Sequence, residues 1–154
     1  MAEYSANAVQ TVNPGETVVF TESPVPCTRG FVRHRDGTGN FLLSGTCCRR
    51  RCACKGPASA MYLVEFGANI AVPEGETVGA ISVAIAVDGA TVPASEMEVT
   101  PAAVDNFFNV GRAINVPIWA GCCETVSVRN TSAIPITVSN ANIIFTRPDL
   151  AVTR

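Results

Sequence analysis

Four cysteines fall within eight residues and are the side chains of this sequence best suited to chemistry. Cys47, Cys48, Cys52 and Cys54 lie in one segment together with three arginines. Four thiolates can hold Zn²⁺ tetrahedrally, and nearby arginines favour the thiolate form that binds metal or is oxidised. Because the spacing is not that of a C-x₂-C knuckle, three interpretations stay open: a zinc site, a disulfide-stapled loop between two strands, or free thiols.

The other three cysteines are Cys27, Cys122 and Cys123. Adjacent cysteines do not readily bond to each other, so one of the pair is expected to face inward as a small apolar residue. The other could reach Cys27, the clustered cysteines or a neighbouring chain. With seven cysteines at least one has no partner within the chain, which leaves a cross-link between chains or a buried spectator thiol.

No residue pattern predicts catalysis. His34 is the only histidine and lies between Arg33 and Arg35 at a predicted turn, so we expect it to be solvated. The carboxylates show no acid/base pairing, and the chain has no glycine-rich phosphate loop and no H-E-x-x-H motif. Asn130 begins an N-glycosylation sequon, but no secretory route is evident. We expect a non-enzymatic protein.

Composition excludes several classes of partner. The 154 residues are 47% apolar and 16% charged, with a formal net charge of −2. No basic field exists to attract nucleic acid or an anionic membrane. The N-terminal residues lack the basic and apolar regions of a signal peptide, and the longest apolar run, residues 80–87, is too short to span a bilayer. We expect cytoplasmic synthesis. Ten of the eleven basic residues are arginines, which suit interfaces as well as solvated surfaces.

Alternation of apolar and polar side chains indicates the secondary-structure elements of this chain. Apolar residues recur at every second position from Tyr62 to Ile70, and again from Ile81 to Val87. Successive side chains of a strand point to opposite faces, so both segments are predicted to be strands with one apolar face. Turn signals at residues 73–76 and 88–89 bound them.

Further strands are predicted between the remaining Gly and Pro signals. They cover residues 16–20, 30–32, 40–44, 90–99, 109–118, 124–130 and 134–145. In the last of these segments the apolar residues lie at even-numbered positions up to Val138 and at odd-numbered positions from Ile143. This change predicts a bulge or turn near residues 140–142. Without β-α-β alternation, roughly ten short strands predict an all-β antiparallel sandwich of jelly-roll type in a single domain over residues 1–154.

Four segments resemble the compact jelly roll of the C1q/TNF superfamily, especially the domain at the tip of BclA-type spore-surface proteins. The segments are residues 12–20, 62–70, 87–90 and 126–131. Domains of this superfamily form tight homotrimers that bury aromatic and aliphatic residues around a threefold axis. The resemblance therefore implies self-association, although this chain has no collagen-like stalk.

Three other segments are similar to small proteins encoded beside capsid genes in phages of gut Firmicutes. They are the opening Ala6–Val12, residues 66–73 and residues 100–110. This similarity implies a virion accessory protein, such as a capsid decoration or head-fibre knob, that binds the major capsid protein or another virion protein. Location on the virion surface would then follow cell lysis.

The trimer contacts are predicted to use large apolar residues beyond those that a small sandwich needs inside. These residues are Phe107, Phe108, Ile114, Ile118 and Trp119. Two alternatives stay open: a module that binds a host surface glycan or protein through its loops, and a spore-surface structural protein cross-linked through cysteines. No cofactor is expected unless the clustered cysteines bind zinc.

Overall fold

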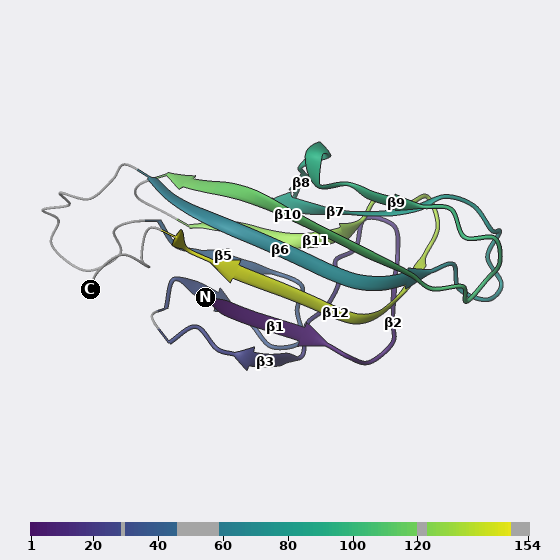
Figure 1. Cartoon of the computed structure of the whole chain (residues 1–154), viewed down its shortest axis with the longest axis horizontal. Coiled ribbons are helices and arrows are strands. Elements are labelled where there is room, and N and C mark those ends of the chain that lie inside the picture. The colour runs from purple at the N-terminus through teal and green to yellow at the C-terminus, as the bar shows by residue number, and fades with distance from the viewer. Residues whose placement is uncertain (29, 46–58, 120–122, 149–154) are drawn as a thin grey trace, which may run out of the picture.

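The protein is an all-β sandwich of two antiparallel sheets (Figure 1). The computed structural model describes residues 1–28, 30–45, 59–119 and 123–148. In these ranges the chain forms twelve strands and one 3₁₀ helix, and no α-helix. The described part of the chain therefore contains no helix long and apolar enough to cross a membrane.

The first sheet, sheet A, has the strand order β10-β6-β12-β1-β3, with β2 also paired to β12. Its strands are β1 (Ala2–Ala6), β2 (Gln10–Val12), β3 (Glu22–Val25), β6 (Ser59–Ala71), β10 (Phe108–Trp119) and β12 (Ile136–Thr146). The long strands β6 and β10 pair in register along their whole length, from Ile70 opposite Phe108 to Ser59 opposite Trp119. This leaves β10 as one edge of sheet A.

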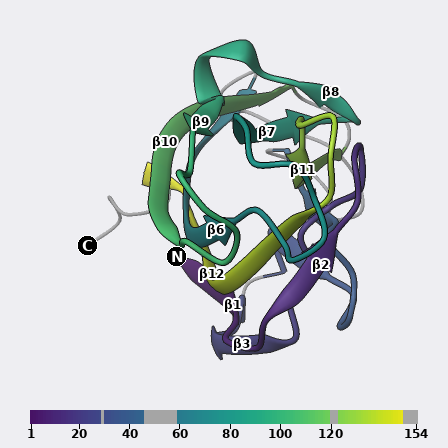
Figure 2. The same ribbon diagram turned by 90° about the vertical axis from the view of Figure 1, so that its right-hand side faces the viewer.

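The second sheet, sheet B, has the order β4-β5-β11-β7-β8, with β9 also paired to β7. Its strands are β4 (Val32–His34), β5 (Phe41–Leu43), β7 (Ile81–Val87), β8 (Ala90–Thr91), β9 (Met97–Val99) and β11 (Glu124–Asn130). The 3₁₀ helix η1 (Pro93–Ser95) joins β8 to β9. Both β9 and η1 contact β10, so the edges of the two sheets meet there (Figure 2).

The chain alternates between the sheets, which defines the topology as a jelly roll. From β5 onward it runs from sheet B to β6 in sheet A, back to β7, and then through β10, β11 and β12 in alternate sheets. Jelly rolls pair strands across two sheets in this way. The prediction of an antiparallel jelly-roll sandwich is confirmed.

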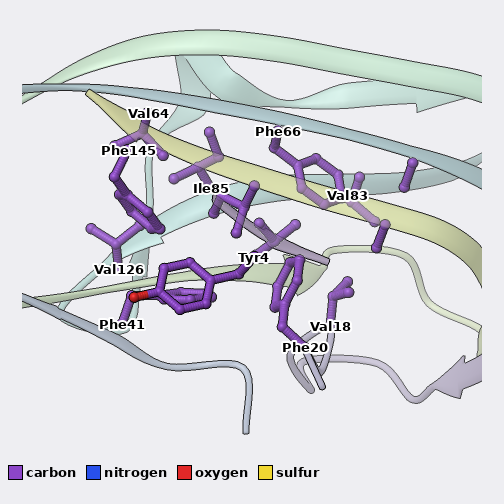
Figure 3. Close-up of a cluster of buried hydrophobic side chains, with 14 of the residues drawn as sticks. Tyr4, Val18, Phe20, Phe41, Val64, Phe66, Val83, Ile85, Val126 and Phe145 are labelled. Atoms are coloured by element: carbon purple, nitrogen blue, oxygen red, sulfur yellow. The ribbon is translucent and has the colours of Figure 1, made fainter. Parts of the chain in front are cut away.

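The core lies between the sheets and follows the alternation seen in the sequence. Val64 and Phe66 point inward from sheet A, and Val83 and Ile85 face them from sheet B (Figure 3). Tyr62, two residues before Val64 on β6, is buried as well. Burying each such side chain stabilises the fold by roughly 1.5–3 kcal/mol. An aromatic group fills one part of this core: the ring of Phe41 lies within 5.2 Å (between ring centroids) of the rings of Tyr4, Phe20 and Phe145.

Strand β7 differs from the expectation of one apolar face, because its second face is buried too. Ser82, Ala84 and Ala86 are all buried. Ser82 Oγ hydrogen-bonds Thr131 Oγ1 at 2.7 Å, and Ala84 lies opposite Arg129, whose Nη1 donates to the Gly89 carbonyl. The small residues on this second face of β7 are thus covered by the side chains of neighbouring segments and not by solvent.

The bulge predicted near residues 140–142 is confirmed. The register between β12 and β6 shifts between Ser139 and Asn142, and Asn140 adopts a φ of 48°. Asparagine is one of the few residues that tolerate this left-handed conformation. The extra residue changes the side-chain phase, so that both Val138 and Ile143 reach the core.

The strand predicted over residues 16–20 does not form as a regular strand. This segment makes only two isolated bridges, Thr17 to Arg129 and Phe20 to Thr38. The amide group of Gln10 takes the place of a partner strand: its Oε1 accepts from the Val19 N–H at 2.8 Å, and its Nε2 donates to the Val19 carbonyl at 2.9 Å. The rest of the segment pairs with two different neighbours: the Val18 N–H donates to the Val128 carbonyl at 2.9 Å and the Phe20 N–H to the Thr38 carbonyl at 3.1 Å. The prediction failed because this divided pairing forms no continuous ladder.

Candidate functional site

The edge strand β10 carries exposed large apolar residues at both of its ends, Phe108 and Trp119. Its side chains alternate, with Val110, Val116 and Ile118 buried and several of the residues between them exposed. Edge strands that carry exposed apolar residues are sites of association. The structure divides the five predicted interface residues among three places along this strand.

Ile118 is not available to a partner. Its side chain is fully buried in the core of its own subunit, because it lies on the inward face of β10 opposite Ala60. Ile114 lies on the same face but near the open edge of the sandwich, where it is partly buried and packs against the core. The prediction is corrected for Ile118, whose apolar character serves internal packing.

Phe107 and Phe108 lie far from Trp119. They precede or begin β10, whereas Trp119 ends it. At about 3.3 Å per residue, roughly 35 Å separates the two ends of the strand. Phe107 is 42% exposed and Phe108 38% exposed, so both remain accessible. The predicted residues do not form one cluster.

Trp119 belongs to an apolar surface on the outer face of sheet A. It is 66% exposed and lies two residues beyond Pro117 on the same face. Pro117 pairs directly with Met61, which is 42% exposed, and Leu63 follows Met61 on this face of β6. We call Met61, Leu63, Pro117 and Trp119 the Trp119 patch.

Pro117 determines how this edge can associate. Proline has no N–H, so the outer edge of β10 lacks a donor at this position, and proline on edge strands opposes the addition of another strand. Farther along, β9 and η1 contact β10. Association at this edge is therefore expected to use side-chain packing rather than extension of sheet A.

A pocket of about 340 Å³ lies on the other side of the same strand, where β10 faces the end of β7. We call it the edge pocket. Its lining residues are Val87, Val92, Ile114, Asn115, Val116, Pro117, Trp119 and Glu124. Pro117 and Trp119 are shared with the Trp119 patch, so one strand separates two apolar surfaces.

Glu124 gives the edge pocket its only carboxylate. Burial raises the pKa of Glu124, and the nearby negative charge of Asp88 raises this pKa further. Asp88 is held in place because its Oδ1 accepts the Thr125 N–H at 2.7 Å. The pocket wall is thus apolar with an acidic margin, where a hydrogen-bond donor or a cation would relieve the repulsion between the two carboxylates.

The predicted zinc or disulfide residues Cys47, Cys48, Cys52 and Cys54 lie outside the described residues, as does Cys122. Cys27 is partly buried, and its Sγ accepts the Val32 N–H at 3.4 Å. Cys123 is also partly buried. In the part of the chain that the structure describes, no three His, Cys, Asp or Glu side chains gather as metal ligands. Metal binding and cross-linking at the cysteines remain predictions.

His34 is not a solvated turn residue, and this expectation was wrong. Its side chain is 2% exposed and stacks on Phe41, with ring centroids 4.5 Å apart. Its Nε2 lies 2.9 Å from the Thr38 carbonyl oxygen. The cause is register: His34 pairs with Phe41 across β4 and β5, which places its ring against the aromatic part of the core.

Asn130 serves the fold rather than modification. It is 1% exposed, and its Nδ2 donates to the carbonyls of Val12 and Ile134, both at 2.9 Å. These bonds tie the end of β11 to β2 and to the turn before β12. A glycan on Asn130 would replace one of the two Nδ2 hydrogens, so at least one of these bonds would be lost, and the sugar would have to occupy the protein interior.

No protein-family model matches this chain, and no curated protein matches it. Among solved structures, the chain is similar to the globular domain of zebrafish complement 1qA protein. The TM-score is 0.49 at 11% sequence identity, over 93% of this chain and 94% of that one.

The chain is also similar to two carbohydrate-binding modules of family 35. One, from Clostridium thermocellum, gives a TM-score of 0.35 at 16% identity over 92% of this chain and 91% of that chain. The other, from Paenibacillus barcinonensis, gives 0.34 at 17% identity over 94% and 97%. These likenesses concern the arrangement of strands.

Sequence reasoning missed Met61, Leu63 and Pro117. A signal was present, because Met61 and Leu63 place apolar residues on the face of β6 that alternation assigns to solvent. Proline at position 117 within an apolar run also marks an edge strand. Only the pairing of β6 with β10 shows that these residues share one surface with Trp119.

Proposed function

We propose that this protein is a non-enzymatic structural protein that forms a homotrimer and is displayed on a phage virion. The exposed Trp119 carries the trimer part of the proposal. It lies between the apolar Trp119 patch on the outer face of sheet A and the edge pocket beside β10. A tryptophan this exposed, beside Met61 and Pro117, gains more from a partner surface than from water.

Two different apolar surfaces on one subunit favour a ring. When one patch meets a different patch on the next copy, the contact is head-to-tail and closes if the rotation between copies allows it. The edge of one subunit, with its pocket, would pack on the outer face of sheet A of the next. Both surfaces share β10, so three copies would bring their β10 strands near one axis.

Display on a virion is supported by the similarity of residues 6–12, 66–73 and 100–110 to capsid-adjacent phage proteins. The partner would be the major capsid protein or another virion protein. Mass spectrometry of density-purified phage particles tests this directly. The proposal expects the protein in the particles at a fixed ratio to the major capsid protein. Its recovery only from spore coats, or only from the lysate supernatant, would contradict the virion role.

A second candidate function is binding of a host surface glycan, and the edge pocket favours it. An exposed indole ring can stack on the apolar face of a sugar, while the side chains of Asn115 and Glu124 offer hydrogen bonds to hydroxyls. A glycan array with the wild-type protein and a Trp119→Ala variant separates the two functions. Binding that Trp119→Ala abolishes, in a protein whose mass is unchanged by the substitution, would favour recognition over assembly.

A further inference from the structure

We propose that the edge pocket binds an amino sugar, whose ammonium group lies against Glu124 and whose ring lies against Trp119. This inference rests on the second candidate function, glycan binding, and names the class of sugar. Three observations carry it: the lining of the pocket, the charge beside it and the exposed aromatic ring.

The edge pocket has negative charge on one side and no positive charge in its lining. Of its eight lining residues only Glu124 is ionisable. Asp88 lies beside Glu124, because the Asp88 N–H donates to the Thr125 carbonyl and Asp88 Oδ1 accepts the Thr125 N–H, both at 2.7 Å. A ligand that reaches Glu124 is therefore close to two carboxylates.

The turn between β7 and β8 keeps the second carboxylate in place. Asp88 and Gly89 have φ angles of 48° and 82°, as in the tight hairpin turns that aspartate and glycine favour. The two bonds to Thr125 tie this turn to β11. Because the charge is held before any ligand arrives, little ordering would be needed on binding.

Neither carboxylate has an ion-pair partner within the part of the chain that the structure describes. Arg129 reaches the same turn, but its Nη1 donates to the Gly89 carbonyl at 3.0 Å. Burial and the charge of Asp88 raise the pKa of Glu124, the direction expected for a carboxyl group that no cation balances. An ammonium group in the pocket would supply the opposite charge and charge-assisted hydrogen bonds.

The rest of the lining indicates what carries the ammonium group. Trp119 is the only aromatic lining residue, and an indole face packs against apolar C–H groups and attracts a nearby cation. The Asn115 amide can donate to and accept from a hydroxyl group. Apolar C–H groups, hydroxyls and an ammonium group occur together in an amino sugar.

The size of the pocket favours a small ligand. Its volume of about 340 Å³ lies near the lower end of the range for small-molecule sites, which suits a single sugar ring. Anionic sugars and nucleic acid would be repelled by the two carboxylates. A lysine side chain brings the ammonium group but no hydroxyl for Asn115, so it serves as a probe in the test.

NMR titration of the Trp119 indole tests the proposal. The chain has one tryptophan, so its single indole N–H signal reports on the pocket. The probes are glucosamine, N-acetylglucosamine, glucose and lysine amide. We expect glucosamine to shift this signal with an affinity about tenfold higher than that of each other probe. Added salt should reduce the advantage of glucosamine over the neutral sugars, because salt screens the attraction between charges.

Variants locate the charge that is recognised. Glu124→Gln should lower the affinity for glucosamine to that of the neutral sugars. Glu74→Gln removes the same charge at the exposed turn between β6 and β7 and should bind glucosamine like the wild type. The titrations are repeated in Met61→Ser, which weakens the proposed trimer without adding a charge, because the pocket would face the next copy in a trimer. Circular dichroism checks that each variant is folded.

The outcomes separate this inference from the function on which it rests. Equal affinity for glucosamine and the neutral sugars would overturn the amino-sugar inference while glycan binding itself is upheld. No binding of any sugar, by the wild type or by Met61→Ser, would contradict both. Equal binding of glucosamine by the wild type and Glu124→Gln would overturn the inference, as would binding of lysine amide as tight as that of glucosamine.

Discussion

Met61 and Pro117 lie directly opposite each other on β6 and β10, on the outer face of sheet A. Cross-strand neighbours of this kind have Cβ atoms about 5 Å apart and behave as one surface. Trp119 extends this surface at the end of β10, and Leu63 extends it along β6. The pair thus forms the centre of an apolar area on a stretch of the edge strand where Pro117 opposes the addition of a further strand.

A charge at Met61 should break the assembly. In Met61→Asp, association would require burial of an unpaired carboxylate, which is costly. We expect the trimer to dissociate at least about tenfold more readily, as measured by light scattering over a dilution series. Val9→Asp is the matched control, since Val9 is 67% exposed on the loop between β1 and β2. Equal masses for both variants at every concentration would contradict the assignment of the patch.

Trp119 should report assembly through its own fluorescence, because it is the only tryptophan in the chain. In an isolated subunit its ring is mostly in water, and packing in a trimer would move it to an apolar environment. We expect emission at shorter wavelength at high protein concentration and a red shift on dilution. The Met61→Asp variant should show the red-shifted emission throughout. Emission independent of concentration in both proteins would contradict burial of Trp119.

Tyr62 should be required for stability through its hydroxyl group. It donates to the Ser44 carbonyl at 2.6 Å and lies 3.2 Å from the Phe31 carbonyl, and all of these groups are buried. Tyr62→Phe keeps the ring but leaves the carbonyls without this donor, which should cost about 1–2 kcal/mol. Urea unfolding should show a lower midpoint with an unchanged slope. An unchanged midpoint would mean that water replaces the hydroxyl.

Glu124 should make stability depend on pH. Burial, and secondarily the charge of Asp88, raises the pKa of Glu124 in the folded protein. Just above the ordinary carboxyl pKa of about 4.3, the folded state therefore holds a proton that the unfolded chain has lost. The free energy of unfolding falls as pH rises through this window.

The Glu124→Gln variant lacks this titration. Relative to the wild type, its melting temperature should rise as the pH increases above about 4.3 and should stay constant once Glu124 is ionised in the folded protein too. The shift should be small, because Glu124 is only partly buried and solvent screens its charge. Thermal melts of both proteins over this range measure the difference. Parallel curves at every pH would contradict the raised pKa.

Much of the fold could be predicted from the sequence, because a strand with one buried face has apolar residues at every second position. Residues 62–70 and the phase change before Ile143 gave strand β6 and the bulge at Asn140 correctly. The irregular pairing of segment 16–20 could not be predicted, since Val18 bonds β11, Phe20 bonds Thr38 and Val19 bonds the Gln10 side chain, contacts that no local pattern encodes. The prediction that His34 is solvated was wrong for a similar reason, because its position opposite Phe41 depends on strand register.

The candidate site was only partly visible in the sequence. The sequence singled out Phe107, Phe108, Ile114, Ile118 and Trp119 as surplus apolar residues, but Ile118 and Trp119 are neighbours that point to opposite faces of β10. Sequence alone does not fix which of two adjacent apolar residues is inside when the apolar run is continuous. The pairing of Met61 with Pro117 joins two segments more than fifty positions apart, so it needed the sheet.

The mass of the protein in solution tests the central claim most directly. Size-exclusion chromatography with light scattering, at micromolar concentration and under non-reducing and reducing conditions, measures it without a label. We predict a particle of three times the 16.1 kDa chain mass in both conditions, because the proposed assembly depends on side-chain packing and not on cysteine cross-linking. A 16.1 kDa particle with Trp119 still in water would contradict the account.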